Sequence, residues 1–183
     1  MKMRKTDLVI GHINLAKAFD RSSENFVSLL EGLQRKGVAQ HVLVRNPTLA
    51  EKLSIIDDIT VGPVVRSAVM AYCHMPQLDI VHIHDMAAGQ AGLLLALTRS
   101  IPFVLTHRGD FEGGTGALAQ AIYRRASRII CCDDSEVSIL RHLEPTLRIE
   151  IIPDIERSGT ADAHLRVYQN SQRMPMAGSN GIQ

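Results

Sequence analysis

Short aliphatic runs alternate with longer segments of helical periodicity over most of the chain, and this alternation constrains the fold more than any other feature. Parallel strands joined by helices produce this pattern, with the helices crossing over in a right-handed sense. The sequence therefore predicts an α/β fold, with a doubly wound, mostly parallel sheet of about seven strands and helices on both faces. The expected strands are 7–13, 38–45, 58–62, 78–84, 101–107, 128–133 and 147–153, and the expected helices are 23–37, 47–54, 63–75, 86–100, 117–127 and 135–144.

Composition excludes several functional classes. The 183 residues are 45% hydrophobic but only 4% aromatic, so the core is expected to be aliphatic. A net charge of +1 gives no basic field for nucleic acid, which is not an expected partner. No apolar run approaches the roughly 20 residues that span a bilayer, and the basic N-terminus lacks the long apolar region of a secretory signal. We expect a cytoplasmic protein.

The three cysteines, Cys73, Cys131 and Cys132, are an odd number, and two of them are adjacent. Neither a disulfide framework nor a zinc site has this spacing, so they are interpreted as reduced core thiols.

The chain changes character after the last expected strand. Residues 1–156 are predicted to form one domain, and 157–183 a polar tail. The tail is expected to contain one weak helix around 161–168 and to be disordered from about Asn170.

Ligands of doubly wound sheets bind outside the carboxyl ends of the strands. This rule selects candidate positions before any motif is considered. The polar residues expected at these ends are His12, Asn14, His84, Asp85, His107, Arg108, Asp133, Asp134 and Asp154.

The segment 11–25 passes from a strand end into a helix N-terminus, where backbone N–H groups favour an anion such as phosphate. It has serines where a phosphate loop usually has glycines. The alternative interpretation is a polar loop in which Ser23 caps the helix 23–37. The phosphate-loop candidates are Asn14, Lys17, Arg21, Ser22, Ser23 and Glu24.

The stretch His82-Ile83-His84-Asp85 places its two histidines on one face of a strand. A metal site is one interpretation, with His107 as a third ligand, but the aspartate stands one position too early for the H-x-H-x-D-H pattern. We expect no metal. His82 is interpreted as a core histidine bonded to neighbouring backbone, whereas His84 and Asp85 are placed to touch a ligand.

The segment 105–114 ends a strand in His107 and Arg108 and continues through Asp110 into a glycine-rich loop. Arginine binds phosphate or carboxylate with two prongs, and histidine or aspartate suits proton transfer or the orientation of a sugar hydroxyl. The Arg-Gly-Asp triplet in this loop is interpreted as a coincidence.

Arg124, Arg125 and Arg128 cluster at the end of the helix 117–127. They either complement the helix dipole or contact anionic lipid headgroups at the inner face of a membrane.

Six segments in order resemble the N-terminal domain of retaining glycosyltransferases of the B fold, in particular glycosyltransferase family four. They are HINLAKAF, LLEGLQRKGVAQHVLVR, LDIVHIHD, IPFVLTHRGDF, YRRASRIICCDDSEVSIL and IEIIPDIE, and together they cover about residues 7–156. The resemblance is strongest to bacterial enzymes that add sugars to lipopolysaccharide core or other envelope glycans.

This resemblance implies two Rossmann-like domains facing a cleft, with the acceptor on the N-terminal domain and the nucleotide-sugar donor mainly on the other. Transfer would retain the anomeric configuration and need neither metal nor cofactor. The positions carried over as acceptor or substrate candidates are His84, Asp85, His107 and Arg108, and Asp110 is added from the adjoining loop.

The sequence departs from the family pattern in three ways. Arg21-Ser22-Ser23 replaces the usual glycine pair, although Glu24 remains. The histidine usual after the expected strand 101–107 is displaced or replaced by Arg108. The chain ends where a donor-binding domain would begin, so a separately encoded C-terminal half is an expected partner.

Three functions are compatible with these observations. The first is the acceptor-binding half of a glycosyltransferase that uses a nucleotide-sugar and a glycan or glycolipid acceptor, poorly active alone. The second is a non-catalytic binding module on the same fold. The third is a metal-dependent hydrolase built on residues 82–85.

Overall fold

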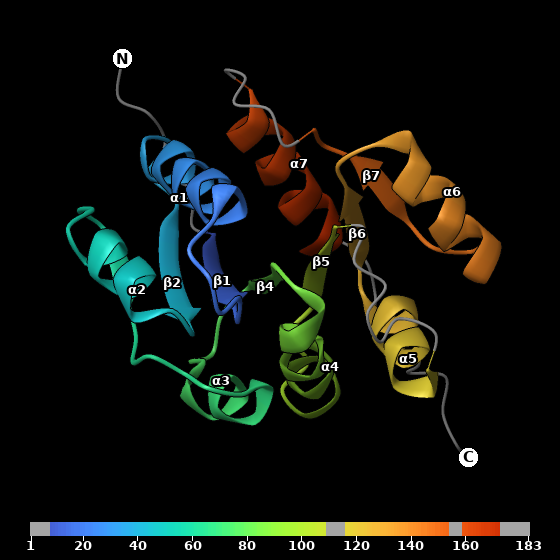
Figure 1. Ribbon diagram of the computed structural model, residues 1–183, viewed down its shortest axis with the longest axis horizontal. Helices are drawn as coiled ribbons and strands as arrows, with labels where there is room; N and C mark the ends of the chain where they lie inside the picture. The colour runs from blue at the N-terminus through green and yellow to red at the C-terminus, as the bar shows by residue number, and fades with distance from the viewer. Residues whose placement is uncertain (1–7, 109–115, 154–158, 173–183) are drawn as a thin grey trace.

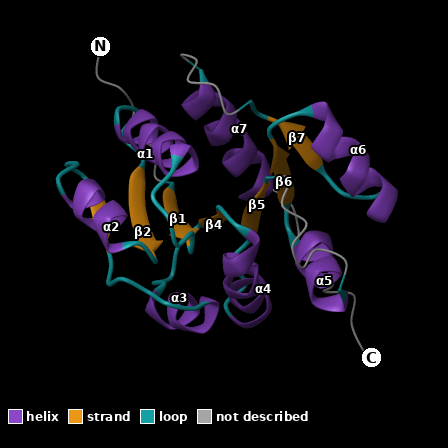
Figure 2. Cartoon of the chain, viewed as in Figure 1, coloured by secondary structure: helices purple, strands orange, loops and turns teal. Residues whose placement is uncertain are grey.

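The computed structural model describes residues 8–108, 116–153 and 159–172 (Figure 1). Figure 2 shows strands and helices alternating along the described chain. The strands are β1 (Val9–Asn14), β2 (Ala39–Val44), β3 (Ile59–Val61), β4 (Ile80–Ile83), β5 (Phe103–His107), β6 (Arg128–Cys131) and β7 (Ile149–Ile151). The helices are α1 (Arg21–Gln34), α2 (Pro47–Ser54), α3 (Ala68–His74), the 3₁₀ turn η1 (Met86–Ala88), α4 (Gly89–Thr98), α5 (Ala117–Arg125), α6 (Asp134–Leu143) and α7 (Thr160–Gln172).

The seven strands form one sheet in the order β3-β2-β1-β4-β5-β6-β7, and every neighbouring pair is parallel. The predicted doubly wound sheet is therefore confirmed. The strand order reverses between β1 and β4, which places the topological switch point there. His12 of β1 is in register with His82 of β4 across this pair.

Local sequence explains where the helices begin and end. Asn46 caps α2 by accepting a hydrogen bond from the Leu49 N–H, and Pro47 occupies the first helical position. The expected cap of α1 is wrong, because Asp20 rather than Ser23 caps it. Asp20 accepts from the Ser23 N–H, while the Ser23 hydroxyl lies 3.4 Å from the Asp20 backbone nitrogen in a capping box.

Helices cover both faces of the sheet (Figure 1). Helices α1, α2 and α7 lie on one face, which we call the front, and α3, α4, α5 and α6 pack on the back. The largest cluster of buried side chains joins the back helices to alternate strand residues such as Ile83 and Phe103. Gly92 permits the close approach of α4, because a Cβ there would lie 2.9 Å from both of these side chains.

Helix α7 completes the front of the sheet. Its Tyr168 is fully buried, and Val167 joins a cluster with Ile80 of β4, Val104 of β5 and Ile130 of β6. The weak helix expected at 161–168 is therefore longer, and part of the expected polar tail belongs to the core. The buried face of α7 is hard to recognise in the sequence, because it carries the polar residues His164 and Ser171 as well as apolar ones.

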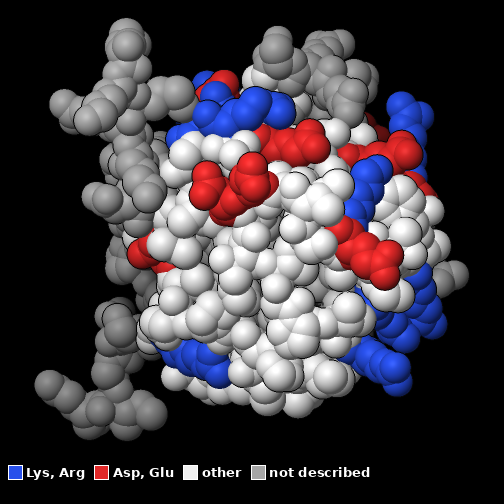
Figure 3. Space-filling view, turned by 90° about the vertical axis from the view of Figure 1, so that its left-hand side faces the viewer, with Lys and Arg blue, Asp and Glu red and all other residues white. Residues whose placement is uncertain are grey.

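Figure 3 faces the side of the molecule that carries α2. Acidic side chains lie above its centre, basic side chains lie at its upper, lower and right-hand margins, and its lower middle carries neither, so no single-sign field dominates this side. Among the residues that the structure describes, no helix has both the length and the apolar character needed to cross a bilayer.

We expect Val167→Ala to lower the free energy of unfolding by roughly 2 kcal/mol, since the two lost methyl groups are buried against the sheet. Val69→Ala in α3 is the matched control, because Val69 is 56% exposed and should change stability little. Urea denaturation measures both. Equal effects would mean that α7 does not pack on the sheet.

Candidate functional site

Strand alternation decides which polar residues share a face. His82 of β4 points to the front, as does His84 just beyond the strand, while Ile83 between them packs into the back core. On β5, Thr106 contacts His82, whereas His107 contacts Tyr123 of α5 on the back. The neighbouring residues Thr106 and His107 therefore point to opposite faces of the sheet.

A cavity of about 670 Å³ lies on the front, between α1, α7 and the carboxyl ends of β4 to β7. Its floor includes His84, Thr106 and Cys132, and Arg108 and His164 also line it. Charged and polar residues, such as Lys36 just after α1 and Asp162 of α7, form part of the remaining wall, and apolar residues such as Phe26 form another part. The cavity therefore combines polar and charged groups with apolar surface, and small-molecule sites commonly join the two.

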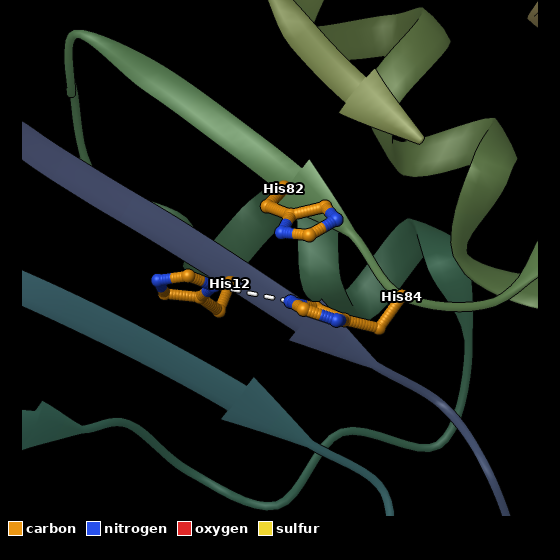
Figure 4. A group of neighbouring side chains, drawn as sticks. All are labelled: His12, His82 and His84. Carbon is orange, nitrogen blue, oxygen red and sulfur yellow. Dashed lines mark hydrogen bonds between the residues drawn. The ribbon is translucent and has the colours of Figure 1, made fainter. Parts of the chain in front are cut away.

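Three histidines lie together at the switch point, His84 of the cavity floor with His12 and His82 beside it (Figure 4). His12 of β1 and His84 approach to 3.1 Å between Nδ1 and Nε2, and the ring centroids of His82 and His84 are 3.8 Å apart. All three side chains are buried, with at most 5% of the residue exposed. The switch point between β1 and β4 is therefore packed with imidazole rings.

His82 is held by two hydroxyl groups. Its Nδ1 lies 2.7 Å from the Tyr168 hydroxyl oxygen, and its Nε2 lies 2.7 Å from Thr106 Oγ1. The expectation that His82 is a buried residue agrees with this position, but its partners are side chains rather than the neighbouring backbone. Tyr168 belongs to α7, which lies in the segment predicted to be a polar tail.

Burial keeps these imidazoles neutral. Desolvation, followed by the nearby His164, lowers the pKa of His12 to about 3. Desolvation also lowers the pKa of His82 and His84 well below the ordinary value, and the positive charge of Arg108 contributes to both shifts. Neutral rings offer one donor and one acceptor nitrogen each.

The same three rings form a set of donor atoms within 4.8 Å of one another that could hold a metal ion. However, both nitrogens of His82 already have hydroxyl partners, so coordination there would break a hydrogen bond. No carboxylate belongs to the set to offset the charge of a divalent ion in this buried position. The donor set therefore fits a hydrogen-bonded cluster better than a metal centre.

Asp85 forms hydrogen bonds with the backbone. Its carboxylate accepts from the Leu15 N–H at 2.5 Å and from the Ala88 N–H at 2.9 Å, and it caps η1. Burial raises its pKa, although hydrogen bonds from these N–H groups oppose the shift. Asp85 does not line the cavity, so its position supports a role in joining the β1 and β4 strand ends.

His107 also lies away from the cavity, with its Nδ1 3.0 Å from the Tyr123 hydroxyl on the back. Asp110 lies outside the described residues. Of the four substrate candidates that the structure describes, His84 and Arg108 line the cavity, and Asp85 and His107 do not.

The segment expected to form a phosphate loop is largely helical. Arg21, Ser22, Ser23 and Glu24 form the first turn of α1. The buried Asn14 accepts from the Ala16 N–H, and the side chain of Lys17 is exposed while its carbonyl accepts from Asn46. None of the six candidates lines the cavity. Ser22 nevertheless accepts a hydrogen bond from Arg108, which ties α1 to the end of β5.

The basic cluster on α5 and β6 is largely balanced by carboxylates. Arg124 pairs with Glu144 at 2.6 Å, and Arg128 lies 3.6 Å from Glu150. Arg125 is partly buried. These contacts give two of the three arginines a structural partner, which reduces the charge available to lipid headgroups.

Sequence reasoning missed Thr106, Cys132 and His164 as cavity residues. Thr106 could have been found, because strand alternation places it on the same face as Val104 and opposite His107. His164 could not, since its position depends on how α7 packs against the sheet.

The family model for Glycosyltransferase Family 4 matches residues 25–154, which is more than half of the chain. The chain belongs to glycosyltransferase family 4. None of the curated proteins matches this family 4 domain in sequence.

Two solved structures share the fold of the family 4 domain. Sucrose-phosphate synthase from Thermosynechococcus elongatus is 15% identical, with a TM-score of 0.59, and the alignment covers 88% of this chain and 96% of that one. A UDP-N-acetylglucosamine 2-epimerase is 12% identical, with a TM-score of 0.55, and the alignment covers 80% of this chain and 48% of that one. The resemblance expected from the sequence is thus confirmed for family and fold.

The buried histidines predict a loss of stability in acid. The folded pKa of His12, about 3, lies below its unfolded value of 6.5, so the unfolded state binds more protons between these values. The contribution of the neutral His12 to the free energy of unfolding should therefore be fully present above pH 6.5. It should fall as the pH drops, by roughly 2 kcal/mol at pH 5.

Urea denaturation between pH 7 and pH 5 measures this loss, and His12→Phe should flatten part of it. A wild-type profile that stays level over this range would contradict the assignment of neutral buried rings.

Asp85→Ala should lower the free energy of unfolding by about 1–3 kcal/mol, since two backbone N–H groups lose their acceptor. Asp57→Ala, at an exposed turn, is the control and should have little effect. Thermal unfolding compares the two. Unchanged stability in Asp85→Ala would instead return Asp85 to the ligand-binding candidates.

Proposed function

We propose that this family 4 domain is the acceptor-binding half of a glycosyltransferase. In this proposal the sugar comes from a nucleotide-sugar and is transferred to an envelope glycan or glycolipid, of the kind found in lipopolysaccharide. Transfer retains the anomeric configuration and uses neither a metal nor a cofactor. The domain works at the cytoplasmic side of the membrane.

The observation that carries the proposal is the coincidence of a family match with a cavity at the carboxyl ends of β4 to β7. Doubly wound sheets bind their ligands at this edge. The cavity wall also includes Phe26 and Leu29 of α1 and Ile152 beyond β7, which offer apolar surface to a sugar ring or a lipid segment.

Two polar residues of the cavity, and Asp85 outside it, have proposed roles. Arg108 supplies positive charge for a phosphate or carboxylate of the substrate. His84 offers one neutral ring nitrogen to an oxygen atom of the substrate, because its other nitrogen faces His12. Asp85 acts indirectly, through the strand ends that it joins.

A second half that closes over this edge is part of the proposal. Binding of the donor and its phosphates would fall mainly to that second half, so residues 1–183 alone should bind substrates weakly and transfer sugar slowly or not at all. A non-catalytic binding module would use the same cavity, and absence of transfer in the reconstituted pair would favour it.

The test measures binding and transfer separately. We expect nucleotide-sugars or acceptor glycans to give saturation-transfer NMR signals with the chain. Arg108→Gln should weaken this binding roughly tenfold or more, as expected for loss of a charged hydrogen bond. Arg66→Gln, at an exposed position before α3, is the matched control and should bind normally.

Two results would contradict the proposal. Robust sugar transfer by residues 1–183 alone would show that the chain is not half of an active site. Absence of binding to every nucleotide-sugar and glycan tried, with a folded protein, would remove the glycosyltransferase assignment itself.

A further inference from the structure

The hydrogen-bond partners of Tyr168 determine which nitrogen of His82 carries the proton. Tyr168 is fully buried, and its hydroxyl has one hydrogen-bond partner among the described residues, the Nδ1 of His82. If His82 Nδ1 carried a proton, it would donate to the Tyr168 oxygen, and the hydroxyl hydrogen of Tyr168 would have no acceptor. A buried donor without an acceptor is costly, so Tyr168 donates to an unprotonated Nδ1.

The proton of His82 therefore resides on Nε2, because burial keeps the ring neutral with one N–H. This Nε2–H points at Thr106 Oγ1, 2.7 Å away, and donates to it. The hydroxyl hydrogen of Thr106 is then not used by His82. Since Thr106 lines the cavity, its hydroxyl is available as a donor to a bound ligand.

The hydrogen bonds of His12 and His84 also determine where their protons lie. His12 Nδ1 and His84 Nε2 share one proton at 3.1 Å, and His12 Nε2 is buried without a partner in the described part of the chain. An orphaned N–H is the rarer defect, which favours a bare Nε2 and a proton on Nδ1 of His12. His84 Nε2 then accepts, and the proton of His84 resides on Nδ1, the nitrogen left for the cavity.

We propose that Thr106 and His84 form a floor whose hydrogen-bond donors bind an oxyanion, with Arg108 supplying charge at the cavity wall. Both floor residues offer a hydrogen to the cavity. His84 Nδ1–H offers no acceptor there, and Thr106 Oγ1 keeps one lone pair beside the one that accepts from His82. A phosphate or carboxylate is acceptor-only when ionised, so it satisfies all three groups at once. A sugar hydroxyl carries no negative charge to pair with Arg108, so it would bind there less strongly than an oxyanion.

Tyr168 is a positioning residue of this subsite. It touches no ligand in this arrangement, but its hydroxyl sets the tautomer of His82 and so the direction of the Thr106 hydroxyl. The subsite lies in the cavity of the proposed function, yet oxyanion binding does not depend on sugar transfer. A binding experiment can therefore fail or succeed independently of catalysis.

The first measurement uses the unmodified full chain. Long-range ¹H–¹⁵N NMR spectra of the histidine side chains distinguish the two tautomers, and we expect Nε2–H for His82 and Nδ1–H for His84. Nδ1–H on His82 would overturn the inference without any variant. Tyr168→Phe should remove the preference of His82, which a merely structural role of the hydroxyl would not do.

The second measurement is calorimetric titration with inorganic phosphate. Thr106→Val should weaken phosphate binding roughly tenfold or more, while Thr106→Ser keeps the hydroxyl and should bind like the unmodified chain. Thr60→Val, at an exposed position of β3, is the control substitution. No phosphate binding by the unmodified chain, or equal binding by Thr106→Val, would overturn the proposal.

Competition identifies the source of the oxyanion. Displacement of phosphate by uridine diphosphate would assign the subsite to a nucleotide, and displacement by glucose 1-phosphate would assign it to a phosphorylated sugar. Either result supports an oxyanion subsite. Failure of both compounds to displace phosphate would overturn its assignment to a substrate.

Discussion

The hydrogen bond between Tyr168 and His82 joins the last described helix to the centre of the sheet, and the front of the molecule depends on it. Right-handed crossovers place α1 and α2 over β1 to β3, and they place the later helices on the back. This topology leaves the front of β4 to β6 without a covering helix. Helix α7 fills that position, and the imidazole of His82 gives its buried hydroxyl an acceptor.

The cavity is a consequence of the same packing. Helices α1 and α7 touch near Gly32, where a Cβ would lie 2.8 Å from the Cβ of Ala161, and the wall between them continues to the strand ends. Histidine rings lie together at the switch point, at and beside its floor. Because those rings are desolvated, they act as neutral hydrogen-bonding groups of fixed orientation rather than as charges.

Much of the fold could be predicted, because strand and helix periodicities are local properties. The bounds of α2 were predicted correctly, since Pro47 marks its beginning. The site was harder, because it depends on which way a strand-end side chain points. His84 and Arg108 line the cavity. His107 points to the back of the sheet, and the carboxylate of Asp85 accepts hydrogen bonds from backbone N–H groups. Helix α7 was underestimated because polar side chains on its buried face find partners only in the folded protein.

The late position of α7 has a consequence for synthesis of the protein. Val167 and Tyr168 complete a cluster that begins with Leu8 and Ile10, so contacts close over about 160 residues of chain. A nascent chain of which only the first six strands have emerged from the ribosome has a front face that is still uncovered and apolar. Such long-range closure is slow and leaves intermediates prone to aggregation. We therefore expect this half of the core to remain open until α7 has emerged from the ribosome.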